Sequence, residues 1–244
     1  MSPADHPTPT VVLVHGAFAD ASSWNGVIER LQAEDVPVTA PANPLRGISE
    51  DSAYITDVLE EIPGPVLAVG HSYGGAVITN AASKVDNVVG LVFVAAFAPE
   101  DGETLGEASA SSKDSVLNSA LTTHHYPGNG GEAVEFAIDP SKFQDAFAAD
   151  LPPEQTALMA ATQRPIAELA FSEPTKTPAW KDLPSWAVVA TGDKAAGADL
   201  IRSMAQRAGA TITEIQGSHV IMVSQPEKVA DVIMEAVAAV PVPA

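Results

Sequence analysis

Along the chain, short apolar runs rich in β-branched residues alternate with longer stretches whose apolar residues recur every three or four positions. An uninterrupted apolar run predicts a strand buried on both faces of a parallel sheet, and the longer period predicts an amphipathic helix. Six strands are predicted, at residues 10–16, 36–41, 65–70, 88–97, 185–193 and 211–217. Helices are predicted at residues 22–34, 49–62, 74–85, 198–210 and 226–240. This alternation predicts a six-stranded, mostly parallel, doubly wound α/β sheet flanked by helices.

The alternation stops between about residues 100 and 184. This segment is rich in Ser, Thr, Pro, Gly and Asp, and only scattered stretches such as residues 152–171 have a helical pattern. We therefore expect a helical cap, inserted before the penultimate strand of the sheet. Residues 1–244 together are then one domain, which is common for an α/β chain of this length.

Charge and composition narrow the partners that the chain can have. The chain has 12 Lys and Arg against 31 Asp and Glu, a formal net charge of −19. Such an acidic surface argues against nucleic acid and anionic membranes as partners, and it should disfavour strongly anionic substrates. The chain has no Cys, which excludes disulfides, thiol nucleophiles and Cys-ligated metals.

The first ten residues predict no secretory signal. They contain no Lys or Arg, and the apolar run behind them is too short for a signal peptide or a membrane span. A cytoplasmic protein is therefore expected, and the sequence leaves open whether it forms a homodimer.

The segment Gly-His-Ser-Tyr-Gly, residues 70–74, lies where a predicted strand ends and a predicted helix begins. At such a sharp turn the serine hydroxyl is exposed above the sheet, and only small residues fit two positions before and after it. The alternative is an ordinary glycine-rich turn. The position of the motif favours Ser72 as a nucleophile.

A serine hydroxyl needs a base to become nucleophilic. Of the six histidines, His219 follows the last predicted strand, at the carboxyl edge of the sheet, from which it could reach Ser72. His6 lies near the N-terminus, His71 should point away from Ser72, and the pair 124–125 in the cap is more typical of a solvated site. We therefore predict His219 as the base.

The base also needs a carboxylate that orients it. Asp193 ends a predicted strand at the same edge of the sheet, whereas Asp199 is expected to cap the following helix. We favour Asp193. The N–H groups of Ala17 and Tyr73 are the expected donors to an oxyanion, because Ala17 follows the His-Gly turn after the first strand and Tyr73 follows the nucleophile.

These residues resemble the α/β-hydrolase family, in particular the small esterase branch that includes plant methyl-ester hydrolases, hydroxynitrile lyases and bacterial carboxylesterases. The segments VVLVHGAFADASSW, GHSYGGAVI, LVFVAAFAPEDG and GSHVIMVSQPEKV carry the resemblance, which fades in the cap. It implies an α/β-hydrolase fold with Ser72 as nucleophile, Asp193 and His219 completing the triad, and Ala17 with Tyr73 forming the oxyanion hole. It also implies that Phe18, Phe97 and Val220 lie at the substrate pocket.

The lyases of this branch have Thr where this chain has Gly16, and Lys where it has Val220. Both differences favour ester hydrolysis. We therefore expect a serine hydrolase that cleaves carboxylic esters of small, largely uncharged substrates through an acyl-enzyme. The resemblance implies no cofactor and no metal. Hydrolysis of lactones or amides, acyl transfer and cofactor-free perhydrolysis remain open because they use the same triad. A small-molecule receptor with slow turnover is the alternative of another class.

Overall fold

The structure is a computed structural model, and it describes residues 8–128 and 130–240. His6 lies outside the described residues, as does most of the N-terminal stretch on which the expectation about secretion rested.

Six parallel strands form the central sheet, in the order β2-β1-β3-β4-β8-β9. They are β1 (Thr10–Val14), β2 (Val38–Thr39), β3 (Val66–His71), β4 (Val88–Val94), β8 (Ser185–Ala190) and β9 (Thr211–Ile215). The predicted parallel sheet is confirmed, although most strands end earlier than predicted. The shortest is β2, which lies between Pro37 and Pro41, because proline has no N–H to donate to a neighbouring strand.

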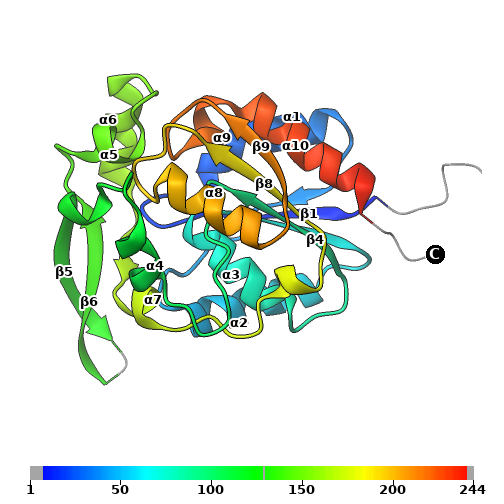
Figure 1. The fold of residues 1–244 in the computed structure, drawn as a ribbon, viewed down its shortest axis with the longest axis horizontal. Coiled ribbons are helices and arrows are strands. Elements are labelled where there is room, and N and C mark those ends of the chain that lie inside the picture. The colour runs from blue at the N-terminus through cyan, green and yellow to red at the C-terminus, as the bar shows by residue number, and fades with distance from the viewer. Residues whose placement is uncertain (1–7, 129, 241–244) are drawn as a thin grey trace, which may run out of the picture.

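Helices cover both faces of this sheet (Figure 1). On one side α1 (Asn25–Ala33) packs against α10 (Pro226–Ala239), and on the other α2 (Ile48–Glu60) packs against α3 (Tyr73–Ala82). A further helix, α8 (Ala198–Arg207), packs against β8 and β9. Short helical turns complete this part of the fold: η1 (Ala21–Trp24), η3 (Ala179–Lys181) and α9 (Ile221–Ser224).

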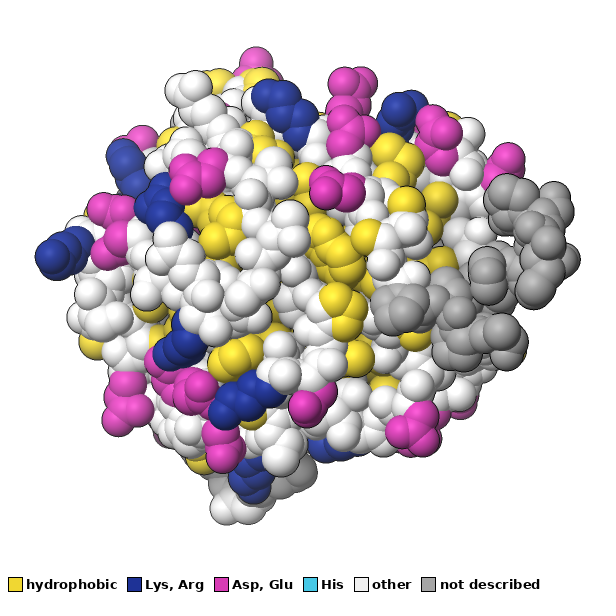
Figure 2. All heavy atoms as spheres, turned by 45° about the vertical axis from the view of Figure 1, so that its right-hand side comes forward, with side chains coloured by type: hydrophobic (Ala, Val, Ile, Leu, Met, Phe, Trp, Pro, Cys, Tyr) yellow, Lys and Arg dark blue, Asp and Glu magenta, His cyan; other side chains and the backbone are white. Residues whose placement is uncertain are grey.

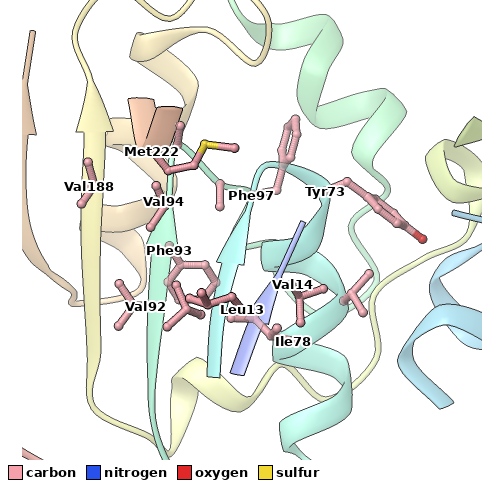
Figure 3. Packing of buried hydrophobic residues seen from close by; sticks show 14 of the residues in the cluster. Leu13, Val14, Tyr73, Ile78, Val92, Phe93, Val94, Phe97, Val188 and Met222 are labelled. Atoms are coloured by element: carbon pink, nitrogen blue, oxygen red, sulfur yellow. The ribbon is translucent and has the colours of Figure 1, made fainter. Parts of the chain in front are cut away.

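The core lies between the sheet and these helices. Every residue of β4 is buried, and Figure 3 shows Phe93 packed among side chains from β1 and α3, with Leu13 and Ile78 nearby. Burying one such side chain contributes roughly 1.5–3 kcal/mol to folding. Trp180 and Trp186 also belong to this core, with 8% and 7% of their surface exposed.

The segment between β4 and β8 forms a cap beyond the carboxyl ends of the strands (Figure 1). Its helical parts are α4 (Leu105–Ser111), η2 (Leu117–Ser119), α5 (Phe143–Phe147), α6 (Pro153–Thr162) and α7 (Leu169–Ser172). The cap also contains an antiparallel sheet in the order β5-β6-β7, which the sequence did not predict. Its strands are β5 (Leu121–Gly128), β6 (Gly131–Ile138) and β7 (Ile166–Ala167).

The histidine pair of the cap lies on β5, with both residues exposed. His125 Nδ1 is 3.2 Å from Glu132 Oε1 on the paired strand, and His124 Nε2 is 3.0 Å from Thr122 Oγ1. Within residues 8–128 and 130–240, no three His, Asp or Glu side chains are grouped closely enough to hold a metal ion. None of the helices described here is both long enough and apolar enough to cross a membrane.

Candidate active site

Ser72 occupies the sharp turn between the end of β3 and the start of α3. Its backbone angles, φ 51° and ψ −122°, are ones that residues other than glycine rarely adopt. Hydrogen bonds hold this strained backbone on both sides. The Ser72 N–H donates to Val94 O at 3.3 Å, and Ser72 O accepts the N–H groups of Gly75 and Phe97 at 3.0 and 3.2 Å.

Glycines allow the strand ends to approach each other at this turn. A Cβ on Gly70 would lie 2.5 Å from Gly74 O, and a Cβ on Gly74 would overlap Val14 O. A Cβ on Gly16 would lie 2.7 Å from Ser72 Cβ. The sharp turn at Ser72 therefore depends on the absence of side chains at three positions on β3, α3 and the loop after β1.

Asp193 and His219 are in direct contact, with His219 Nδ1 2.8 Å from Asp193 Oδ2. Both side chains are almost fully buried. Asp193 Oδ1 accepts the N–H groups of Ala195 and Ala196, at 2.9 and 3.1 Å, and these bonds fix the orientation of the carboxylate. The carboxylate accepts the Nδ1–H of the imidazole, which leaves Nε2 as the nitrogen that can take up a proton.

His71 does not contribute a group to this contact but packs against the ring of His219, with ring centroids 4.7 Å apart. Its Nε2–H donates to His219 O at 3.0 Å. The residue next to Ser72 in sequence therefore holds the backbone of the predicted base.

Ala17 and Tyr73, the predicted oxyanion donors, lie beside Ser72. The Phe18 N–H donates to Arg164 O at 3.1 Å, whereas no backbone acceptor for the Ala17 N–H is found among the described residues. Tyr73 is the first residue of α3, and the N–H groups of the first turn of a helix have no partner within the helix.

The Tyr73 side chain extends away from the central strands (Figure 3) and its hydroxyl donates to Asp51 Oδ2 at 2.6 Å. Burial raises the pKa of the Asp51 carboxyl. Burial, together with the neighbouring Asp51, raises the pKa of Tyr73 well above its usual range. The Tyr73 hydroxyl is therefore a neutral donor that ties α3 to α2.

A small cavity of about 20 Å³ lies against Ser72 and His219 and has room for about one water molecule. The described residues that line it include no Asp, Glu, Lys or Arg. Aromatic and aliphatic side chains form most of the wall. Phe18 and Phe97 come from the loops after β1 and β4, and Leu105, Leu117, Phe147 and Phe171 come from the cap.

The positions of Val220 and Asp199 differ from those predicted from the sequence. Val220 does not border this cavity and is fully buried in the core, at the start of α9. Asp199 does not cap α8, whose N-cap residue is Gly197. Its carboxylate instead accepts the Ser112 Oγ–H at 2.6 Å and the Lys113 N–H at 2.8 Å, both from the cap.

Three residues that were not predicted from the sequence contact the loops of the site. Arg164 and Asn43 bond to the loop after β1, and the Asp150 carboxylate accepts the Ser218 N–H at 3.0 Å, next to His219. These contacts join residues that are far apart in the chain, so no local sequence pattern marks them.

The pattern of the alpha/beta hydrolase family matches residues 11–232 of this chain. The chain therefore belongs to the alpha/beta hydrolase family, which confirms the fold expected from its sequence.

Several known proteins are similar to it. The carbendazim hydrolyzing esterase of Nocardioides sp. (strain SG-4G) is 34% identical over 108 residues, a match that covers 38% of this chain and 44% of that esterase. The chain thus matches less than half the length of this curated relative. The structure of polyneuridine aldehyde esterase superimposes with a TM-score of 0.80 at 20% identity, covering 94% of this chain and 99% of that one. A pyrethroid hydrolase from Sphingobium faniae JZ-2 gives a TM-score of 0.76 at 20% identity, covering 95% and 98%.

The two structures show that the fold is shared. The family match, and the curated relative over the part that it matches, support an enzyme of the hydrolase or esterase kind.

Proposed function

We propose that the chain is a serine esterase that hydrolyses carboxylic esters of small, largely uncharged substrates through an acyl-enzyme. The observation that carries the proposal is the buried contact between Asp193 and His219 at the cavity that Ser72 also lines. A serine in a strained strand-to-helix turn and an imidazole oriented by a carboxylate are the parts that acyl transfer needs.

In the first half of the reaction, Ser72 Oγ attacks the carbonyl carbon of the ester and its proton passes to His219 Nε2. Among the described residues the His219 ring is hydrogen-bonded to Asp193 and not to Ser72, and such contacts commonly tighten when substrate binds. The electron pair of the carbonyl moves to its oxygen, and this oxyanion accepts the N–H groups of Ala17 and Tyr73. Removing one donor of this kind typically lowers kcat by about 10²- to 10³-fold.

In the second half, the tetrahedral intermediate collapses and the alcohol leaves with the proton from His219. Water then attacks the acyl-enzyme while His219 takes up one of its protons. The second tetrahedral intermediate collapses, Ser72 Oγ leaves and takes that proton from His219, and the carboxylic acid is released. Since the cavity has room for about one water molecule, a substrate must displace side chains such as Phe147 and Leu117 as it enters.

The wall of the cavity supports the substrate class. An unpaired charge moved into an apolar site loses its hydration without compensation, so uncharged esters are favoured. The resemblance implies Thr at position 16 in the lyases of this branch, and its absence here favours hydrolysis. A Cβ at Gly16 would lie 2.7 Å from Ser72 Cβ, so this backbone has no room for that threonine.

The proposal is tested by the release of p-nitrophenol from p-nitrophenyl esters of increasing acyl length. Wild type is compared with Ser72→Ala, with His219→Ala and with the control Ser83→Ala, whose hydroxyl bonds to Asn80 O and Thr177 Oγ1 instead. We expect turnover by wild type and Ser83→Ala, and loss of at least about 10³-fold in the other two variants.

Turnover that persists in Ser72→Ala would exclude Ser72 as the nucleophile. A lactone, an amide and carbendazim, which the Nocardioides relative hydrolyses by name, complete the panel. Absence of turnover on all of them, with a bound small molecule detected by mass spectrometry, would favour the receptor alternative.

A further inference from the structure

Arg164 reaches from the cap to the loop that follows β1. Its Nη1 donates to Asn43 O at 2.8 Å and lies 3.3 Å from His15 Nε2. Its own carbonyl oxygen accepts the Phe18 N–H at 3.1 Å. A single residue of the cap therefore contacts the loop through its side chain and its main chain.

Asn43 completes the network around this loop. Its main-chain N–H donates to His15 Nε2 at 2.9 Å, and its Nδ2–H donates to His15 O at 3.0 Å. Asn43 N–H and the Arg164 guanidinium can only donate, so His15 Nε2 is an acceptor and its proton is on Nδ1. That Nδ1–H donates to Gly16 O at 2.9 Å. The contacts of His15 therefore hold its ring as a single neutral tautomer.

Arg164 is itself held firmly on both sides. On its N-terminal side, Gln163 Oε1 accepts the Ile138 N–H at 2.8 Å and Gln163 Nε2 donates to Ile138 O at 2.9 Å, which ties the end of α6 to β6. On its C-terminal side, Pro165 restricts the Arg164 backbone to extended conformations. The next two residues form β7, which pairs with β6.

The partners of the Arg164 guanidinium are unusual for a cation. The ion pairs found among the described residues do not include Arg164. Its donors are instead directed at a main-chain carbonyl and a neutral imidazole. Because it has no carboxylate partner, this half-buried arginine gains little stabilisation from ion pairing. Its planar set of donors is instead well suited to fixing the geometry of a loop.

The network does not bond the Ala17 amide of this loop. Phe18 N–H is bonded to the cap, but for Ala17 N–H no backbone acceptor is found in the described part of the chain, and Ala17 lines the cavity at Ser72. We propose that Arg164 is a positioning residue, which holds the loop from His15 to Phe18 so that the Ala17 N–H points at the carbonyl oxygen of the substrate. This inference rests on the proposed function, because it concerns the oxyanion site of the same reaction.

The physical consequence is specific to the transition state. An oxyanion donor acts best within about 2.7–3.1 Å of the charge that develops on the oxygen, so a small rotation of the loop weakens that bond. Binding of the neutral substrate depends on the apolar wall and is affected much less. Loss of Arg164 should therefore lower kcat while KM changes little.

The test compares Arg164→Met, Arg164→Lys and the control Arg202→Met on p-nitrophenyl acetate. Arg202 pairs with Glu214 at 2.7 Å at the surface, so its replacement also removes one cation but touches no loop of the site. For Arg164→Met we expect kcat to fall about 10- to 100-fold, with KM changed by less than about threefold. Arg164→Lys keeps a cationic donor group and should retain more of the activity, and Arg202→Met should match wild type.

Inhibition by a boronic acid distinguishes the loss of a positioned oxyanion donor from general damage to the site. Phenylboronic acid forms a tetrahedral adduct on a reactive serine and needs the oxyanion donors, whereas neutral benzyl alcohol needs only the apolar wall. In Arg164→Met the inhibition constant of the boronic acid should rise by the factor by which kcat/KM falls, while that of benzyl alcohol stays the same. Equal weakening of both inhibitors would overturn the inference, as would a kcat within about twofold of wild type.

If Arg164→Met does not fold, as judged by circular dichroism, Arg164→Lys and Arg164→Gln provide the same comparison. The result is independent of the test of the nucleophile. Loss of activity in Ser72→Ala together with a fully active Arg164→Met would contradict this inference and leave the proposed function standing.

Discussion

Two buried histidines close to the candidate nucleophile, His15 and His71, are held in their neutral form. Burial is the main cause, and it lowers the pKa of His15 to about 4 and that of His71 well below its usual range. The charge of Arg164 adds to the effect at His15, and the neighbouring His219 adds to it at His71. A neutral ring can accept a hydrogen bond at one nitrogen and donate at the other, as the contacts of His15 require.

These histidines predict how stability depends on pH. Between the ordinary pKa of 6.5 and about 4, an unfolded His15 binds a proton that the folded protein does not bind. The free energy of unfolding should therefore fall as the pH is lowered through this range, by up to about 3 kcal/mol from His15. His71 acts in the same direction. The raised pKa of Asp51 opposes it, because that carboxyl takes up its proton more readily in the folded state.

Urea unfolding at several pH values between 7 and 4 measures this dependence in wild type and in His15→Gln, which cannot titrate at this position. The variant should start less stable at pH 7 but lose less stability on acidification. Parallel curves for the two proteins would show that His15 does not carry the effect.

The sequence predicts a site residue where neighbouring residues or the end of a strand define its position. Ser72 was identified from glycines within two residues of it, and the structure shows that side chains there would collide with backbone. His219 and Asp193 could be selected because parallel strands bring their carboxyl ends to one edge. The contacts of Arg164 could not be predicted, since they join residues more than 100 positions apart.

At the scale of elements, the cap also contacts the loop that carries His219. The Asp150 carboxylate, after α5, accepts both the Ser218 N–H at 3.0 Å and the Ser218 hydroxyl, while Ser218 itself is buried. Replacing Asp150 with Ala leaves two buried donors on this loop without their acceptor. We expect Asp150→Ala to lower the free energy of unfolding by about 1 kcal/mol and to lower kcat, with Asp150→Asn between Ala and wild type.

Asp145→Ala is the matched control, because Asp145 is an exposed carboxylate on the neighbouring α5. Urea denaturation and kcat on p-nitrophenyl acetate measure both effects. If Asp145→Ala and Asp150→Ala lose the same stability and activity, the bond to Ser218 does not support the loop.

The elements that were not predicted from the sequence lie in the cap, and there are physical reasons why the sequence did not indicate them. Strand β5 has no fully buried residue, so it lacks the apolar run or alternation that identified the strands of the main sheet. The helical pattern of residues 152–171 is divided by Pro165, which cannot donate an N–H and restricts Arg164 to an extended backbone. The structure accordingly places α6, β7 and α7 in succession there.

At the scale of the whole molecule, acidic side chains dominate the charge. Figure 2 shows Asp and Glu spread over one face, interspersed with fewer Lys and Arg around apolar side chains. With a formal net charge of −19, the protein should repel an anionic substrate before it reaches the cavity. We therefore expect lower kcat/KM for mono-p-nitrophenyl succinate, which carries a carboxylate, than for the neutral p-nitrophenyl butyrate.

The salt dependence of kcat/KM distinguishes this long-range repulsion from the exclusion of charge by the apolar wall of the cavity. Raising sodium chloride from about 10 mM to about 500 mM shortens the screening length severalfold, so kcat/KM for the succinate ester should rise at least twofold. The rate for the neutral ester should stay nearly constant. An equal response of both esters would mean that the acidic surface does not govern substrate entry.

The cap is inserted between β4 and β8, and this position affects whether recombination can replace one cap by another in proteins of this fold. Through Arg164 and Asp150, the cap holds two of the loops that carry the chemistry. A chimera that received a foreign cap would inherit new walls for its substrate, but it would lose both anchors unless the donor supplied them. Changes of specificity by recombination are therefore coupled to catalytic competence here, and gradual substitution within the cap is the less costly route to a new substrate.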